Sequence, residues 1–237
     1  MGRGTSEVEP RWRGSAILRQ LLAVVEKELR SEFRQRVSVA VTVLSVGVIV
    51  LVLAFALGGT PLSGELFAAL LWVVFFLGLS PAVGRSFLAE EERGTRLLLH
   101  MLTSPAALYW GKLTTNVLIG IVTNVLGYGL FLLFLPVPST PELWAIGVLI
   151  AVAAFGFAAT LTLLSAAIAG AHHRGVLLPI LGLPVVVPLV LPGIEATRRV
   201  VEHAPWAMIM PLVNLMVGYG GAVAIVGFWL FEWVWQE

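Results

Sequence analysis

The residues that could perform catalysis are few in this sequence, and their spacing fits none of the common catalytic motifs. Gly111-Lys112 is similar to the end of a nucleotide-binding P-loop, but the upstream glycine is missing and Leu113 replaces the Mg²⁺-binding Ser or Thr. The stretch GLSPAVG at 78–84 has the wrong spacing for the G-x-S-x-G turn of a serine hydrolase. No H-E-x-x-H zinc motif occurs. We therefore predict that the chain is not an enzyme and does not bind ATP.

Metal or heme ligation by this chain is not predicted either. The sequence contains no cysteine, so thiolate metal sites and disulfides are excluded. His172 and His173 are adjacent and point in different directions on any regular element, which makes them a poor metal pair. His100 and His203 are isolated, and a lone histidine in a loop is usually solvated. We assign no catalytic, metal-binding or cofactor-binding residue to this chain.

The composition is that of an integral membrane protein. Of the 237 residues, 58% are hydrophobic and only 12% are charged. Soluble domains carry roughly 25% charged residues, so this chain cannot cover itself with polar surface. The lipid bilayer is therefore an expected partner. The net charge of +1 does not point to nucleic acid, and we expect none as a partner.

Six apolar stretches are long enough to cross the bilayer as helices, which rise about 1.5 Å per residue. We predict an all-α integral membrane fold, with one six-span domain over 37–237 that follows an N-terminal segment, 1–36. The spans are expected at about 37–57, 66–84, 116–135, 143–169, 175–194 and 207–231.

Basic residues are distributed unequally about these spans. Thirteen of the fifteen Lys and Arg residues fall on the side of the N-terminus, and only Arg198 and Arg199 fall on the other. Because the cytoplasmic loops of membrane proteins are enriched in Lys and Arg, this bias predicts that both termini are cytoplasmic.

The segment 16–36 has a different character from the spans. Charged residues surround most of the predicted helix, but a set of apolar residues recurs at helical spacing along one face. These apolar residues are Leu18, Leu22, Val25, Leu29 and Phe33. An amphipathic basic helix before a first span is typical of a helix that lies in the membrane interface. The alternative is a solvated helix packed on a partner protein.

Small and weakly polar residues form a stripe along the third span, at Asn116, Gly120, Thr123 and Asn124. Such stripes allow helices to approach closely and to hydrogen-bond across their interface. The stripe serves either helix packing or the lining of a pathway.

The fifth span contains four prolines, at positions 179, 184, 188 and 192. Each proline removes a backbone donor and kinks an α-helix, which is tolerated in a membrane where the freed carbonyls are buried in protein or line a cavity. We therefore expect Pro179, Pro184, Pro188 and Pro192 to make this span kinked or partly re-entrant and packed against protein. The prolines either let the span flex or shape a static fold.

The longest cytoplasmic loop, 85–116, is the most informative polar segment. A charged run is followed by an interrupting glycine, an apolar face and a proline that begins a new helix; these residues are Glu90, Glu91, Glu92, Arg93, Gly94, Leu97, Leu98, Met101, Leu102 and Pro105. A short amphipathic helix here could dock a soluble partner or lie in the membrane interface.

Two stretches of this chain resemble a known family. The pattern FLAEEERGTRLLLHMLTSP at 87–105, followed by WGK at 110–112, and the proline-rich RGVLLPILGLPVVVPLVLP at 174–192 are similar to the heme exporter protein B family. Members of that family are ABC-2-like permease subunits of bacterial cytochrome c maturation. The resemblance begins near residue 26 and covers almost all of the chain that follows.

The resemblance implies a bacterial inner-membrane permease that works with a separate ABC-type ATPase subunit, with two permeases for two ATPases. ATP would bind to the partner, residues 90–105 would be the coupling segment, and the N-terminal helix would be an elbow helix on the membrane surface. Heme-handling membrane subunits would be further partners, with heme as a candidate substrate of the complex. Another ABC-2 exporter of lipid, polysaccharide or drug, and a non-transporting assembly factor, are the alternatives.

Overall fold

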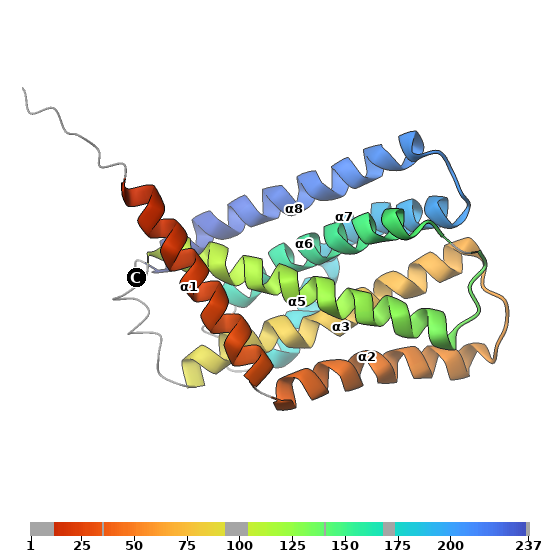
Figure 1. The fold of residues 1–237 in the computed structure, drawn as a ribbon, viewed down its shortest axis with the longest axis horizontal. Helices are drawn as coiled ribbons and strands as arrows, with labels where there is room; N and C mark the ends of the chain where they lie inside the picture. The colour runs from red at the N-terminus through yellow and green to blue at the C-terminus, as the bar shows by residue number, and fades with distance from the viewer. Residues whose placement is uncertain (1–11, 35, 93–103, 140, 168–173, 236–237) are drawn as a thin grey trace, which may run out of the picture.

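The computed structural model describes residues 12–34, 36–92, 104–139, 141–167 and 174–235. Over these ranges the chain is all-α, with no β-strand (Figure 1). The helices are α1 (Trp12–Arg34), α2 (Arg36–Leu57), α3 (Gly64–Glu92), α5 (Pro105–Phe134), α6 (Leu143–Ala167), α7 (Arg174–Val201) and α8 (Trp206–Trp235).

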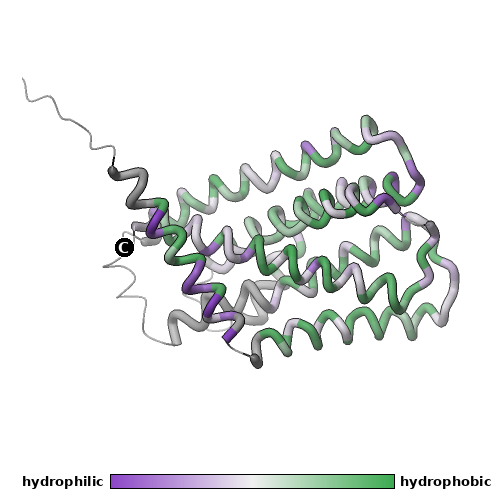
Figure 2. Tube along the Cα trace, in the orientation of Figure 1, coloured by the Kyte–Doolittle hydropathy of each residue, from purple (hydrophilic) through white to green (hydrophobic). Residues whose placement is uncertain are grey.

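Six of these helices are long and apolar enough to cross a membrane, and α1 is the exception. The candidate spans are Val39–Leu57, Gly64–Pro81, Pro105–Phe134, Leu143–Ser165, Leu181–Val201 and Trp206–Glu232. Hydrophilic residues gather on α1 and at the opposite end of the bundle (Figure 2). The all-helical, six-span fold predicted from the sequence is thus confirmed, while the position of α1 in a membrane interface stays a prediction.

The helices run back and forth along one bundle. The turns that join α2 to α3, α5 to α6 and α7 to α8 lie at one end, and the C-terminus lies at the other, on the side of α1 (Figure 1). An even number of spans requires this arrangement, because each crossing reverses the direction of the chain. Helix α1 and the end of α8 therefore share one side of any membrane that the bundle crosses.

Three helices extend well beyond the spans expected from hydropathy, and one of them is α3, which continues to Glu92 rather than ending near 84. Helix α5 begins at Pro105 rather than near 116, because Ser104 caps it: the Ser104 hydroxyl accepts a hydrogen bond from the Ala107 amide at 3.3 Å. Helix α7 continues to Val201 rather than ending near 194. The ion pairs of Glu195 with Arg198 and Arg199 neutralise charge along the helix, so these residues do not end it.

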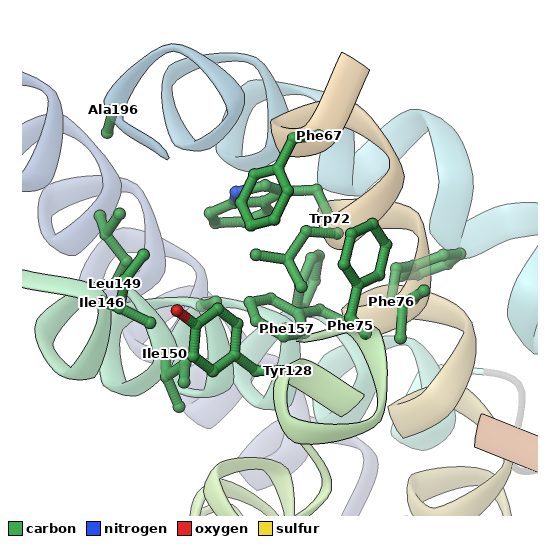
Figure 3. Packing of buried hydrophobic residues seen from close by; sticks show 14 of the residues in the cluster. Phe67, Trp72, Phe75, Phe76, Tyr128, Ile146, Leu149, Ile150, Phe157 and Ala196 are labelled. Carbon is green, nitrogen blue, oxygen red and sulfur yellow. The ribbon is translucent and has the colours of Figure 1, made fainter. Parts of the chain in front are cut away.

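Helix α6 lies at the centre of the packing and contacts α3, α5, α7 and α8. The core around it is rich in aromatic rings, of which Trp72 and Phe157 lie with their centroids 5.6 Å apart (Figure 3). The indole N–H of Trp72 donates to Thr197 Oγ1 at 2.9 Å, and Thr197 in turn donates to the Gly193 carbonyl at 2.8 Å. A buried indole donor is thereby satisfied, and α3 is fixed to α7.

Glycines allow these helices to approach closely. A Cβ placed on Gly193 would lie 2.1 Å from Trp72 Cζ2, and one on Gly156 would lie 2.5 Å from Leu189 Cδ1. Because neither helix backbone can move without disturbing the core, glycine at these positions is a requirement of packing rather than of backbone conformation.

Helix α7 passes through the positions of all four prolines as a single helix, so the re-entrant alternative does not describe it. Pro192 is buried, as expected, whereas Pro184 and Pro188 are exposed on the outer surface of this chain. The expected kink in this span stays a prediction.

We predict that Gly193→Ala lowers the stability of the fold, because the added methyl group meets the Trp72 ring. Overpacking of this kind costs about 1–3 kcal/mol. The measurement is thermal unfolding of the purified protein in detergent. Gly147→Ala is the matched control, since nothing lies within 4 Å of a Cβ at Gly147. Equal melting temperatures for the two variants would contradict the packing described for α3 and α7.

Candidate functional site

Helix α1 lies obliquely across the beginning of α5, at the end of the bundle that holds the C-terminus (Figure 1). Val24 is the centre of this crossing: it is buried, and its Cγ1 would lie 2.7 Å from a Cβ on Gly111. The absence of a side chain at Gly111 therefore lets α1 approach the α5 backbone.

A buried ion pair reinforces the crossing. Lys112 Nζ lies 3.7 Å from Glu28 Oε1, and the side chains are only 1% and 11% exposed, respectively. Lys27 lies 3.1 Å from the same Glu28 oxygen. Moving a charge out of water is costly unless it is paired, so the carboxylate of α1 stabilises an ammonium group that α5 carries into the protein interior.

A third contact joins α1 to the start of α5. The Ser104 hydroxyl donates to Gln20 Oε1 at 3.2 Å, and the Ser104 amide lies 3.5 Å from the same atom. Ser104 is both the N-cap of α5 and the first described residue after the gap at 93–103. Helix α1 is thus attached to the point where the predicted coupling segment joins the bundle.

The structure places only part of that predicted segment. Glu90, Glu91 and Glu92 form the end of α3, and Pro105 is the first residue of α5. The remaining predicted residues lie outside the described part of the chain; they are Arg93, Gly94, Leu97, Leu98, Met101 and Leu102. The described residues show that the segment leaves α3 and enters α5, which carries the α1 crossing.

The N-terminal half of the predicted apolar face of α1 points away from the bundle: Leu18 and Leu22 are 60% and 62% exposed. Val25 and Leu29 of the same face are partly buried, and Leu29 lines a groove with α2 and α5, while Val24 contacts α5 from another face. The outward direction of Leu18 and Leu22 is what a helix at a membrane surface or a protein interface would show.

The weakly polar stripe of α5 is gathered on a buried face. The exposed fraction is at most 4% for each of the three polar residues, Asn116, Thr123 and Asn124. Gly120 is also buried and lies against Ala154 of α6. We name these four residues the polar seam. Asn116 and Gly120 lie at the α5–α6 contact, whereas Thr123 faces α3, where its Cγ2 would lie 3.4 Å from a Cβ on Gly78.

Hydrogen bonding in the polar seam is incomplete. The Asn116 amide donates to Thr162 Oγ1 of α6 at 2.8 Å, but among the described residues no side chain or backbone group hydrogen-bonds Asn116 Oδ1 or either side-chain polar atom of Asn124. An unsatisfied buried polar group costs about 1–3 kcal/mol. The seam is therefore a place where water or a polar ligand would be stabilised if α5 and α6 separated.

A lateral groove of about 310 Å³ reaches the polar seam from outside the bundle. Its walls come from α1, α2 and α5, and they are apolar except for Glu32, Thr42 and Thr123. Thr123 thus belongs to both the seam and the groove wall, which connects the interior stripe to the outer surface.

The opposite end of the bundle holds a second concave site. The end of α7 is closed by a paired 6→1 and 5→2 motif, in which the Ala204 amide donates to Arg199 O at 2.9 Å and the His203 amide donates to Val200 O at 3.1 Å. His203 occupies the left-handed position of this motif, with φ of 56°. Glycine is the usual residue there, because a side chain costs roughly 1–2 kcal/mol in that conformation.

A pocket of about 300 Å³ lies beside this turn. His203 lines it together with the indole rings of Trp144 and Trp206, whose centroids are 4.6 Å apart. Sequence reasoning treated His203 as an isolated loop residue, because nothing in the sequence indicates that residues 144 and 206 approach it. It also left Lys112 in a loop, although the Ser104-Pro105 cap places Lys112 two turns inside a helix.

The described residues offer little catalytic chemistry. Within them, no group of three or more His, Asp or Glu side chains could hold a metal ion. At the end of the bundle that holds α1, three contacts attach α1 to the first turns of α5. The polar seam can accept hydrogen bonds, and the pocket at the other end presents an imidazole and two indoles.

Comparison with known proteins identifies relatives over nearly the whole chain. The family model described as CcmB protein matches residues 19–230. A protein named heme exporter protein B, from Bradyrhizobium diazoefficiens, is 28% identical over 221 residues, which cover 86% of this chain and 96% of that protein. The match includes most of α1 and every candidate span.

We predict that the stability of the fold depends on Glu28 and Lys112 being present together. Glu28→Gln removes the carboxylate that lies 3.7 Å from the buried Lys112 ammonium, and breaking a buried ion pair on one side costs about 3–5 kcal/mol. The double variant Glu28→Gln with Lys112→Met should recover most of the loss. Thermal unfolding in detergent measures both.

Glu26→Gln is the matched control for this prediction. It removes the exposed pair that Glu26 forms with Arg30 on the same helix, and exposed pairs of this kind contribute about 0–1 kcal/mol. If Glu28→Gln were as mild as Glu26→Gln, the buried pair would not hold α1 on α5.

Proposed function

The chain belongs to the CcmB protein family, and from this premise we propose that it is the transmembrane permease subunit of an ABC-type complex that handles heme in cytochrome c maturation. The observation that carries the proposal is the family match over residues 19–230, which spans the bundle from α1 to α8. The name of the Bradyrhizobium relative, heme exporter protein B, supports heme as the cargo.

The proposed permease takes its energy from a separate ATPase. The sequence carries no P-loop, so ATP would bind and be hydrolysed on a partner chain. The partner would dock at residues 90–105, between the end of α3 and the start of α5. Two copies of the permease with two ATPases would form the complex, together with heme-handling membrane subunits.

The proposed orientation follows from charge. Helix α1, the end of α3 and the start of α5 lie at one end of the bundle (Figure 1), and the sequence predicts thirteen of the fifteen Lys and Arg residues on the N-terminal side of the spans. We assign this end to the cytoplasm and the bundle to the bacterial inner membrane. Residues 1–36 would then supply an elbow helix, with Leu18 and Leu22 facing lipid, and residues 37–237 the permease domain.

The proposed mechanism is mechanical. Closure of the ATPase would move residues 90–105, and Ser104 would pass that movement to α1 through Gln20 and to α5 through its cap. Because Glu28–Lys112 and Val24–Gly111 attach α1 to α5, the two helices would move together. The polar seam lies further along α5, and it is the place where this movement would part α5 from α6.

The direct test is complementation. We expect this chain to restore c-type cytochromes, measured by heme staining of membrane and periplasmic fractions, in a bacterium that lacks its own heme exporter protein B. The restoring strain should also need the partner ATPase gene. Restoration without any ATPase would favour a non-transporting assembly factor, and failure despite normal membrane insertion and complex assembly would overturn the proposal.

We predict that reversing two charges in the coupling segment, Glu91→Arg with Arg93→Glu, weakens ATPase docking and leaves membrane insertion intact. The reason is that charged groups at an interface guide the choice of partner and its register. Co-purification of the ATPase with the tagged protein measures the effect. Glu65→Arg, at an exposed residue of the opposite end, is the control. Equal recovery of ATPase with both variants would contradict this docking site.

We predict that Asn124→Leu stabilises the fold but lowers cytochrome c maturation. The substitution removes two unpartnered polar atoms, which should raise stability by about 1–3 kcal/mol, and it makes the parting of α5 from α6 less favourable. Asn116→Leu should instead lose stability, because it breaks the bond to Thr162. Thermal unfolding and the heme-stain assay give the two readouts. A destabilised but fully active Asn124→Leu variant would contradict the proposal for the seam.

A further inference from the structure

The pocket at the end opposite α1 is built from three separate parts of the chain. Glu142 and Trp144 come from the start of α6, His203 from the turn after α7, and Trp206 with Ile209 from α8. Its volume, about 300 Å³, is at the lower limit of the range for small-molecule sites. The pocket therefore suits a small group rather than a large cofactor.

The charge of the pocket lining favours a cation. Within the described part of the chain, the lining contains the Glu142 carboxylate and the His203 imidazole but neither lysine nor arginine. Two arginines and two carboxylates near the end of α7 pair with one another; they are Arg198, Arg199, Glu195 and Glu202. Because those charges cancel, a cation in the pocket would be attracted by the Glu142 carboxylate and would face no uncompensated positive charge from them.

Hydrogen bonds between elements hold the pocket walls in place. Ser139 donates to the Val201 carbonyl at 2.6 Å, which joins the α5–α6 connection to the end of α7. Arg199 donates to the Met208 carbonyl at 2.7 Å, which joins α7 to α8. The protein makes these bonds by itself, so the walls are ordered in advance, a condition that lowers the entropic cost of binding.

Two indole rings supply aromatic surface to the pocket. The ring centroids of Trp144 and Trp206 are 4.6 Å apart at an interplanar angle of 58°, so the rings meet at a corner rather than in a parallel stack. A cation within about 6 Å of an indole centroid is attracted by the negative face of the ring. Paired indoles beside a carboxylate are therefore the chemistry of an ammonium site.

The pocket lies at the level where the bundle leaves the apolar part of the membrane. The candidate spans Leu143–Ser165 and Trp206–Glu232 begin beside or within its lining. Tryptophans gather at this level, next to the lipid headgroups. Leu143 and Met208 are 78% and 55% exposed and offer apolar surface to acyl chains close to the pocket. The position thus favours an ammonium group that belongs to a lipid.

The hydrogen-bond acceptors of the pocket select the kind of ammonium. The Glu142 carboxylate accepts hydrogen bonds, and the imidazole of His203 in its neutral form has one acceptor nitrogen. Position 203 is left-handed, where glycine is the usual residue, so the turn itself does not require the imidazole. A primary ammonium has three N–H donors for these acceptors, whereas a trimethylammonium has none. The pocket therefore favours an ethanolamine headgroup over a choline headgroup.

We propose that this pocket binds a phospholipid whose headgroup ends in a primary ammonium, as in phosphatidylethanolamine. Glu142 pairs with the ammonium, His203 accepts one of its hydrogen bonds, and Trp144 and Trp206 contact it with their rings. A lipid held here touches α6, α8 and the turn after α7 together, and it stabilises the packing of these ends of the bundle. The inference uses neither heme nor an ATPase, and it requires only that the bundle crosses a membrane.

The test uses the full-length protein, delipidated in mild detergent and mixed with equal amounts of phosphatidylethanolamine, phosphatidylcholine and phosphatidylglycerol of matched acyl chains. Native mass spectrometry measures which lipid the protein retains. We expect enrichment of phosphatidylethanolamine over both other lipids. Glu142→Gln should lower this enrichment roughly two- to fivefold, the effect of losing one exposed ion pair. Glu65→Gln is the matched control, because Glu65 is an exposed acid of the same end that does not line the pocket.

The indole contacts are tested in the same mixture. Trp144→Leu should lower the enrichment by a similar factor, because an exposed cation–π contact contributes about as much as an exposed ion pair. Trp229→Leu is the control, since Trp229 is 71% exposed in the last turns of α8, at the other end of the bundle. Thermal unfolding without added lipid checks that each variant keeps the fold. Equal retention of the three lipids by the wild-type protein would overturn the proposal, as would an enrichment that Glu142→Gln and Trp144→Leu both retain.

A competition experiment separates a lipid from a soluble source of the same ammonium. Phosphoethanolamine and a lysine-containing tripeptide carry a primary ammonium but no acyl chain. We expect neither to displace phosphatidylethanolamine from the wild-type protein when present in an amount equal to the lipid. Displacement by either compound would show that the pocket takes a soluble amine or a protein side chain, and it would overturn the assignment to a lipid.

Discussion

A charge buried in a protein interior must be paired, and this constraint fixes the part of the structure on which the functional proposal depends. Lys112 is carried into the bundle by α5, and its ammonium group is 3.7 Å from the Glu28 carboxylate of α1. The pair therefore makes α1 part of the bundle rather than a loosely attached extension. Gln20 of the same helix bonds Ser104, the N-cap of α5, so α1 is attached to the start of α5 at a second point.

Polar groups elsewhere in the bundle are also paired or hydrogen-bonded to one another. Trp72 bonds Thr197, and the charges of Glu195, Arg198 and Arg199 satisfy one another near the end of α7. Asn124 departs from this rule, because both of its side-chain polar atoms lack a partner among the described residues. Buried polar groups are usually hydrogen-bonded, so Asn124 is an exception within the buried face of α5.

Much of the fold follows from hydropathy and caps, because both are local signals. Apolar run length predicted six spans, and Pro105 was expected to begin a new helix, which is α5. The length of α7 was missed, since a count of charges cannot tell that Glu195 is neutralised by residues one turn away. The contacts of the candidate site could not be predicted in this way. Glu28 pairs with Lys112, and His203 lines a pocket with two tryptophans, and these residues are too far apart in sequence for any local pattern to indicate the contact.

The central claim is that this chain is the permease of an ATPase-driven complex that handles heme. The most direct measurement is affinity purification of the tagged protein from its own membranes in mild detergent, with mass spectrometry of the proteins that accompany it. Our account predicts a P-loop ATPase together with heme-handling membrane subunits. An intact complex that contains no P-loop ATPase would contradict it.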